Sequence, residues 1–248
     1  MNCVKSAIPG PSTCLPRLAV REAPPLQLGI ALSALFFLAG GFLAGALFPI
    51  AVGGGQYLLS SVYRTLLTLI FNISVAVLGL VWLTNGGLST LRDWARTDRF
   101  LRDMLCGITA GVLLFAAFGI LAVISQKGVP GLWGAWIHFK HPEFHIFLGR
   151  IIKHLLSPIG EEFFFRGLLF SVMASRYGLA KGALASSLIF SAAHFDSLPI
   201  APEDLSRAAW FAFSGLVYCE LFRRRGNLYA AIFAHSAYNL LTSLFYLG

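Results

Sequence analysis

The sequence predicts an all-α polytopic membrane protein, a single bundle of about seven transmembrane helices, and three observations carry this prediction. Of its 248 residues, 57% are hydrophobic and only 12% are charged, whereas about a quarter of the residues in a soluble domain carry a charge. The mean hydropathy is +0.74. Long apolar segments recur along the chain, and short polar connections separate them. These features exclude an ordinary soluble domain.

The apolar segments define seven candidate spans that follow an N-terminal tail. Residues 1–27 are rich in proline and contain no long apolar run, so we expect a flexible tail before a helical domain at 28–248. A helix needs about 20 apolar residues to cross the hydrocarbon core. Seven apolar segments are candidate spans, of which the fifth and sixth are shorter than this length: Leu28–Val52, Thr65–Leu83, Leu101–Ile124, Phe144–Ser175, Gly182–Phe195, Ala208–Phe222 and Leu228–Leu247.

The fourth segment is longer than one span requires, and it holds Pro158 and Gly160 near its middle. Proline removes a backbone donor and collides with the preceding helical turn. We therefore expect a break at this point, with a main helix that begins near Ser157 as its cap. Glu161 and Glu162 would then lie in the opening turns, where the helix dipole favours anions.

Basic residues are distributed unequally between the two sides of the predicted bundle. If the seven spans alternate, twelve Lys and Arg residues of the tail and of the connections near 92–102, 176–181 and 223–225 share one side, and six lie opposite. The positive-inside rule puts the richer side, and the N-terminus, in the cytoplasm. The net charge of +8 thus reflects membrane orientation and does not indicate a nucleic-acid partner.

Two acids and an arginine interrupt the fourth apolar segment in the run Glu161-Glu-Phe-Phe-Phe-Arg166. Residues four apart share a helix face, so Glu162 can pair with Arg166, while Glu161 points about 100° away and is free for another partner. Ionisable residues inside a membrane usually have a function. The alternative is a purely structural network of buried charges.

Two later apolar segments each supply a histidine, in Phe190-Ser-Ala-Ala-His194 and His235-Ser-Ala-Tyr-Asn239. At 1.5 Å per residue, Glu161, His194 and His235 lie about 22, 20 and 15 Å from the cytoplasmic face, so they can meet. A carboxylate and an imidazole that share a water molecule can activate it. His235 and Asn239, four residues apart, can both donate hydrogen bonds to an oxyanion. Each histidine taken alone is as readily a structural hydrogen-bonding residue.

The same groups could instead bind a metal. Glu161, His194 and His235 form a donor set that zinc accepts, with a further position open to water. The H-E-x-x-H spacing, which gives one helix two ligands and a base, is absent from the sequence. The residues therefore allow two kinds of site. One holds a water molecule without a cofactor, and the other holds zinc.

Other polar and aromatic residues are interpreted as interfacial, because such residues gather where helices leave the membrane. This group consists of His138, His141, His145 and His154 around the start of the fourth segment, with Tyr177, Tyr218 and Tyr229 near span ends.

The ordered set E-E-x-x-x-R, F-x-x-x-H and H-x-x-x-N resembles the three motifs of the CAAX prenyl endopeptidase and bacteriocin-processing (CPBP, or Abi) family, and it covers roughly residues 157–248. The resemblance implies an intramembrane endopeptidase, with this region as its catalytic core and a glutamate mechanism favoured over zinc. Glu161 would be the catalytic base and His194 would help to hold the water. The remaining implied roles are oxyanion stabilisation by His235 and Asn239 and support by Glu162, Arg166 and Phe190.

The resemblance also implies partners and a location. The substrate would be a membrane-anchored protein or peptide in the lipid bilayer, in a multi-pass protein of the bacterial inner membrane, and some relatives serve C-terminal sorting systems of the JDVT-CTERM type. A membrane scaffold or bacteriocin-immunity protein of the same family is one alternative. A proton or metal transporter is less favoured, because transporters commonly contain internal repeats and this sequence has no evident one.

Overall fold

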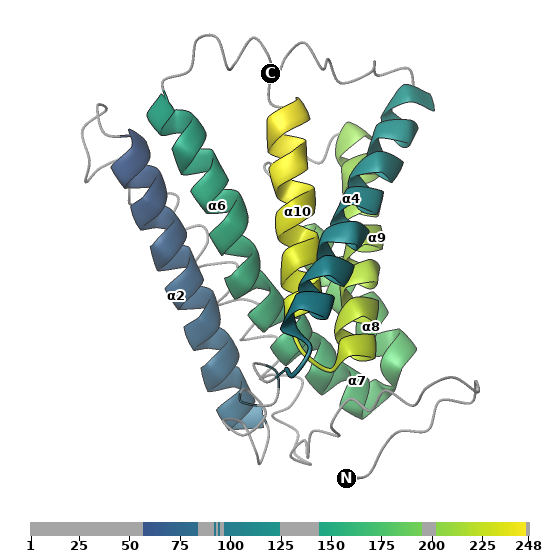
Figure 1. Ribbon diagram of the computed structural model, residues 1–248. Helices are drawn as coiled ribbons and strands as arrows, with labels where there is room; N and C mark the ends of the chain where they lie inside the picture. The colour runs from purple at the N-terminus through teal and green to yellow at the C-terminus, as the bar shows by residue number, and fades with distance from the viewer. Residues whose placement is uncertain are drawn as a thin grey trace.

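The computed structural model describes residues 57–83, 92, 94, 97–124, 144–194 and 202–246, and within them it is helical with short turns. The predicted all-α class is therefore confirmed for these residues. The predicted tail at 1–27 and the first predicted span, Leu28–Val52, lie outside them, so the count of seven spans is not established. The helices are α2 (Tyr57–Leu83), α4 (Phe100–Ile124), α6 (Phe144–Glu162), η1 (Phe163–Phe170), α7 (Ser171–Tyr177), α8 (Leu179–Ala192), α9 (Pro202–Arg225) and α10 (Tyr229–Tyr246), as Figure 1 shows.

One described helix is both long and apolar enough to cross a membrane. It is the segment Phe100–Leu121 of α4, and only 17% of its most apolar window is buried inside the protein. The core helix of a soluble protein would be mostly buried, whereas this helix exposes residues such as Leu101, Leu113 and Ile120. An apolar helix that the protein leaves uncovered is suited to contact with lipid.

The break expected at Pro158 is wrong, because α6 runs without interruption from Phe144 through Pro158 to Glu162. It continues directly into η1, and Glu162 at the junction keeps helical backbone angles. Neighbouring helices and local changes of helix type allow membrane helices to retain an internal proline. Ser157 consequently caps no helix end, and its hydroxyl is available to a side chain.

The η1 segment is a π-helix of eight residues that begins directly after the two glutamates. A π-helix is wider than an α-helix by about one residue per turn; it is rare, and it frequently occurs at functional sites. Seven of its eight residues are buried: Phe164, Phe165, Arg166, Gly167, Leu168, Leu169 and Phe170. The change of helix type therefore lies in the protein interior, directly after the two glutamates, and Arg166 is part of the π-helical segment.

The helices form a bundle in which α6 continues through η1 into α7 in one direction, while α9 and α10 run in opposite directions (Figure 1). Contacts join α2 to α6, α4 to α10, and α8 to α9, while α10 also packs against α6. The segment that leads into α4 and the turn between α9 and α10 lie together at one end of the bundle. The amide of Leu228, in this turn, donates a hydrogen bond to the carbonyl oxygen of Trp94, which precedes α4.

A seam of small residues brings α4 and α10 into close contact. Gly107 and Gly111 on α4 face Ala230 and Ala234 on α10, and a Cβ atom built on Gly107 would lie 2.5 Å from the carbonyl oxygen of Ala230. Glycines four residues apart allow membrane helices to approach backbone to backbone. Ala234 immediately precedes His235, so this seam fixes the part of α10 that carries a candidate site residue.

A buried carboxylate holds the start of α4 to the turn that precedes α10. Asp103 is 2% exposed, and it accepts hydrogen bonds from Arg225, from Asn227 Nδ2 at 2.8 Å and from Thr97 Oγ1 at 2.8 Å. Gly226 has φ +68°, a backbone conformation that favours glycine, and it lets Arg225 and Asn227 reach the same carboxylate. The register of α10 is thus set at its first turn.

We expect Gly111→Ile to separate α4 from α10, because a side chain there meets the backbone of Ala234 and the Cβ of Ala237, the latter at 2.8 Å. Overpacking of this kind costs about 1–3 kcal/mol or more, so the apparent melting temperature of the protein in lipid nanodiscs should fall. Thr109→Ile is the matched control, since Thr109 lies on the exposed side of the same helix. Equal melting temperatures for the two variants would contradict the seam.

Candidate active site

The first motif forms the buried ion pair that its spacing predicts. Arg166 Nη1 donates to Glu162 Oε1 at 2.9 Å, and both side chains are fully buried. Arg166 Nη2 also donates to the carbonyl oxygen of Gly215 on α9 at 3.3 Å. A buried charge is stable only when it is paired and hydrogen-bonded, so Glu162 and Arg166 need each other.

Glu162 also binds the third motif. Nδ1 of His235 lies 2.8 Å from the same Oε1 atom of Glu162 that accepts from Arg166. An ionised carboxylate only accepts hydrogen bonds, so Nδ1 of His235 carries the proton in this contact. One carboxylate oxygen therefore connects η1 to α10 and directs the other ring nitrogen of His235, Nε2, toward Glu161.

Glu161 lies where the two histidines converge. Its Oε2 atom is 3.8 Å from Nε2 of His235 and 4.0 Å from Nε2 of His194. Oε2 is buried and accepts no hydrogen bond within the described residues, whereas Oε1 accepts one from Ser157 Oγ at 3.1 Å. Separations just beyond direct hydrogen-bond length are those that a bridging water spans.

The tautomer of His194 follows from its backbone contact. Nδ1 lies 2.7 Å from the carbonyl oxygen of Phe190, one turn earlier. A carbonyl can only accept, so Nδ1 is the donor, and Nε2 of the neutral ring has a lone pair that faces Glu161. The spacing F-x-x-x-H of the second motif is thus the spacing that lets this backbone carbonyl orient the histidine.

Phe190 lies at the centre of an aromatic enclosure around the charged groups. Its ring packs against His194 at 4.5 Å between centroids and edge-on against His235 at 5.6 Å. The guanidinium of Arg166 lies 4.4 Å from the centroid of the same ring. Phe190 is 1% exposed, so it separates the ion pair from solvent and holds both histidines in place.

Tyr218 is a member of this enclosure, and its interpretation as an interfacial residue is wrong. It is 1% exposed, and its ring stacks on His235 with centroids 5.0 Å apart and an angle of 17° between the planes. Arg166 lies 5.0 Å from the centroid of its ring. Tyr218 lies within α9, near the end of the predicted span Ala208–Phe222. That position in the sequence gives no indication that its side chain is buried beside a histidine.

Asn239 lies one turn after His235 on α10 and is half-buried. Residues four apart on a helix share a face, so its amide is on the side of α10 that carries His235. The structure therefore brings Glu161, His194 and His235 together directly and places Asn239 one turn further along. The catalytic roles assigned to these four residues stay predictions.

The donor types at the site match those of zinc centres. Zinc would take Glu161, His194 and His235 as ligands, and each histidine is already held through Nδ1, as metal-binding histidines commonly are. Within the described part of the chain, no group of three or more His, Cys, Asp or Glu side chains has the close spacing of a formed metal site. The donor types are therefore those of a zinc site, whereas the spacing of the side chains is not that of a formed one.

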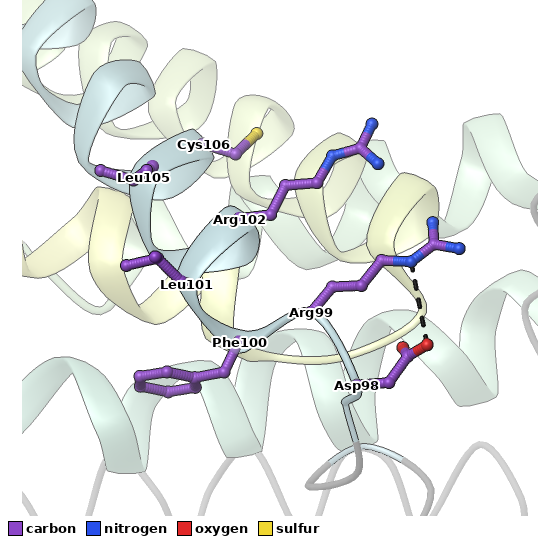
Figure 2. Close-up of a pocket in the computed structure, with 7 residues that line it drawn as sticks. All are labelled: Asp98, Arg99, Phe100, Leu101, Arg102, Leu105 and Cys106. Atoms are coloured by element: carbon purple, nitrogen blue, oxygen red, sulfur yellow. Dashed lines mark ion pairs between the residues drawn. The ribbon is translucent and has the colours of Figure 1, made fainter.

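A separate pocket opens at the start of α4. Its walls are made by Asp98, Arg99, Phe100, Leu101, Arg102, Leu105 and Cys106. Figure 2 shows the guanidinium groups of Arg99 and Arg102 on one side of this helix and the apolar side chains of Phe100, Leu101 and Leu105 on the other. It contains no residue of the three motifs, so it is not the candidate active site.

We expect Arg166→Ala to lower both stability and activity, because it leaves Glu162 buried without its cation. Removal of one partner of a buried ion pair costs about 3–5 kcal/mol. Chemical denaturation in mixed micelles measures the loss, and Arg176→Ala, an exposed arginine at the end of α7, is the control. A stability equal to that of the control would refute the dependence of Glu162 on Arg166.

Comparison with known proteins bears on this site in two ways. A search of curated proteins returns no match. The family model described as type II CAAX prenyl endopeptidase Rce1-like matches residues 143–241, which contain all three motifs. Over this region the chain is similar to that family, and the resemblance that the motifs predict is confirmed.

Proposed function

We propose that this protein is an intramembrane endopeptidase in which Glu161 and His194 activate a water molecule for attack on a peptide bond. The observation that carries the proposal is the arrangement of Glu161 Oε2, which faces Nε2 of His194 at 4.0 Å and Nε2 of His235 at 3.8 Å. The family match over residues 143–241 supports proteolysis as the reaction class.

The water would be held by two acceptors. An ionised Glu161 and the lone pair on Nε2 of His194 can each accept one hydrogen of the same water, which leaves an oxygen lone pair directed away from both groups. As the oxygen attacks the carbonyl carbon, Glu161 takes the proton. Ser157 Oγ, which donates to Oε1 of Glu161, fixes the carboxylate so that Oε2 is the atom directed at the water.

His235 would stabilise the negative charge on the attacked carbonyl oxygen. Its Nδ1 proton is used in the bond to Glu162, so donation from Nε2 requires a doubly protonated ring. Glu161 and Glu162 carry two negative charges, and Arg166 with a protonated His235 would carry two positive ones. Such a balanced buried group avoids an unpaired charge. Asn239 would supply a second donor to the oxyanion.

The proton would then pass to the leaving amine. Glu161 holds the proton taken from the water and can deliver it as the carbon–nitrogen bond breaks. His194 can do so only after its Nε2 atom has taken the second proton of the water. Bond cleavage yields a carboxylic acid and an amine, which end as a carboxylate and an ammonium group once the second proton of the water has passed from the acid to the amine, and the site returns to its starting protonation state after one water is consumed. No covalent enzyme intermediate and no cofactor is needed for this sequence.

The substrate would reach this site from the membrane or from the side opposite the basic connections. The start of α4 and the ends of α7 and α9 lie at one end of the bundle (Figure 1). In the sequence Arg99, Arg176 and Arg225 stand at or next to these helix ends, so the positive-inside rule assigns that end of the bundle to the cytoplasm. We propose a location in the bacterial inner membrane with a cytoplasmic N-terminus and a membrane-anchored protein or peptide as substrate. A role in a C-terminal sorting system would suit this arrangement.

Glu161→Gln should abolish cleavage and leave the fold intact, because the amide preserves the shape of the side chain but cannot take a proton. General-base catalysis contributes about 10²–10⁴-fold, so the rate should fall by at least about a hundredfold. Mass spectrometry of a membrane peptide pool treated with purified protein in nanodiscs measures the rate. Glu220→Gln, at the end of α9, is the control, and full activity of the Glu161 variant would eliminate Glu161 as the base.

Activity should survive removal of metal ions, since we favour water held by Glu161 and His194 over a zinc-bound water. Dialysis against a chelator followed by elemental analysis and the same cleavage assay tests this. The zinc mechanism would be supported instead if one equivalent of zinc were present, if its removal stopped turnover and if its return restored it.

A further inference from the structure

The pocket at the start of α4 contains none of the three motifs and has no part in the proposed chemistry. It has a volume of about 610 Å³, which lies in the range of small-ligand sites. The guanidinium groups of Arg99 and Arg102 lie on one side of it, and the apolar side chains of Phe100, Leu101 and Leu105 lie on the other (Figure 2). A ligand that fits both sides has an anionic part joined to an apolar part.

The polar side of the pocket carries positive charge that its neighbours balance only weakly. Asp98 lies 3.9 Å from Nε of Arg99, and both side chains are exposed, so this ion pair contributes little. Arg102 is exposed as well, and it makes no ion pair with another described residue. By contrast, Arg223 near the end of α9 is paired with Glu220. The two arginines of the pocket are therefore available to an anionic ligand.

The chemistry of two guanidinium groups favours a phosphate. Each guanidinium presents a planar fork of donors that binds a phosphate through two parallel hydrogen bonds. Basic residues close to a membrane surface also attract anionic lipid headgroups. Arg99 precedes α4 and Arg102 lies in its first turn, so both are next to the end of a helix that is long and apolar enough to cross the membrane.

An exposed apolar stripe leads from this pocket along α4. Leu101, Leu105, Ile108 and Val112 follow one another at intervals of four, three and four residues, a spacing that places them on one side of the helix. All four side chains are exposed. The stripe is about 16 Å long at 1.5 Å per residue, which is roughly half of a hydrocarbon core of about 30 Å. We call these four residues the apolar stripe of α4; its length matches the depth of one leaflet.

We propose that the pocket binds an anionic phospholipid, with the phosphate held by Arg99 and Arg102 and an acyl chain along the apolar stripe of α4. The stripe decides for a lipid over a soluble phosphate compound, because only a lipid covers both the charged and the apolar side. This end of the bundle is the one that we assign to the cytoplasm, where the leaflet carries the anionic headgroups. The proposal does not depend on the protease function.

The bound lipid should stabilise the protein. Asp103, the neighbour of Arg102, is buried and connects the start of α4 to Asn227 in the turn before α10. A lipid that holds the start of α4 in place therefore favours the native arrangement of both helices. A ligand that binds only the native state raises the melting temperature, so the protein should melt at a higher temperature in nanodiscs that contain the anionic lipid.

The test places the full-length protein in nanodiscs that contain equal amounts of phosphatidylglycerol and phosphatidylcholine with the same acyl chains. Native mass spectrometry of the released protein counts the lipids of each kind that stay bound. We expect one phosphatidylglycerol per chain, retained over phosphatidylcholine by about tenfold or more. This magnitude follows because each basic residue near an anionic lipid contributes about fivefold in affinity.

The variants decide whether this pocket is responsible. The double variant Arg99→Gln with Arg102→Gln should reduce the preference below about twofold, and Arg102→Lys alone should keep part of it. Arg176→Gln is the matched control, since Arg176 is an exposed arginine at the same end of the bundle, and it should keep the full preference. Asp98→Asn should increase the preference, because it removes the acid that competes for Arg99.

Equal retention of the two lipids by the parent protein would overturn the proposal, as would a preference that persists in the double variant. An equal loss in Arg176→Gln would also overturn it, because the lipid would then respond to the overall charge of this surface. Glycerophosphoglycerol, which has the headgroup without acyl chains, and inorganic phosphate are added as competitors. Displacement of the bound lipid by either at equal concentration would reject the apolar stripe and identify a site for a soluble phosphate compound.

Discussion

A single buried carboxylate, that of Glu162, is the point on which the candidate active site depends. It accepts from Arg166 at 2.9 Å and from His235 at 2.8 Å through the same oxygen atom. The guanidinium is in turn enclosed by the rings of Phe190 and Tyr218, and those rings also pack against His235. Three helical segments are therefore held by one charge-balanced cluster, and its geometry directs His235 toward Glu161.

The packing outside the site serves the same geometry. Gly107 and Gly111 let α10 approach α4 closely just before His235, and Asp103 fixes the turn from which α10 begins. Membrane helices gain little from hydrophobic burial against one another, because lipid is equally apolar. Small residues and buried hydrogen bonds therefore have the larger part in setting the position of α10.

Much of this architecture could be predicted from the sequence, because helical composition and residue spacing are local properties. The boundaries of α4 and α10 lie close to the predicted spans, and the spacing of Glu162 and Arg166 predicts their ion pair. The continuity of α6 was missed, because the effect of Pro158 depends on neighbouring helices. The π-helix shifts every face that follows Glu162, so periodicity could not show which residues meet across helices.

Contacts between helices also could not be predicted from the sequence. Nothing in the spacing of the third motif indicates that Nδ1 of His235 binds Glu162, or that Tyr218 stacks on its ring. Ser157 has the composition of a helix cap, yet its hydroxyl binds Oε1 of Glu161. These contacts depend on the rotation of each helix about its axis, which is decided by packing of the whole bundle.

The central claim is that Glu161 activates water and does not itself attack the peptide bond. Single-turnover cleavage in water enriched with ¹⁸O separates these routes, with mass spectrometry applied to both product and enzyme. The account predicts one ¹⁸O atom in the new carboxylate of the first product molecule and no label in Glu161. Unlabelled first product together with ¹⁸O in the Glu161 carboxylate would contradict it, because that pattern requires a covalent intermediate on the glutamate.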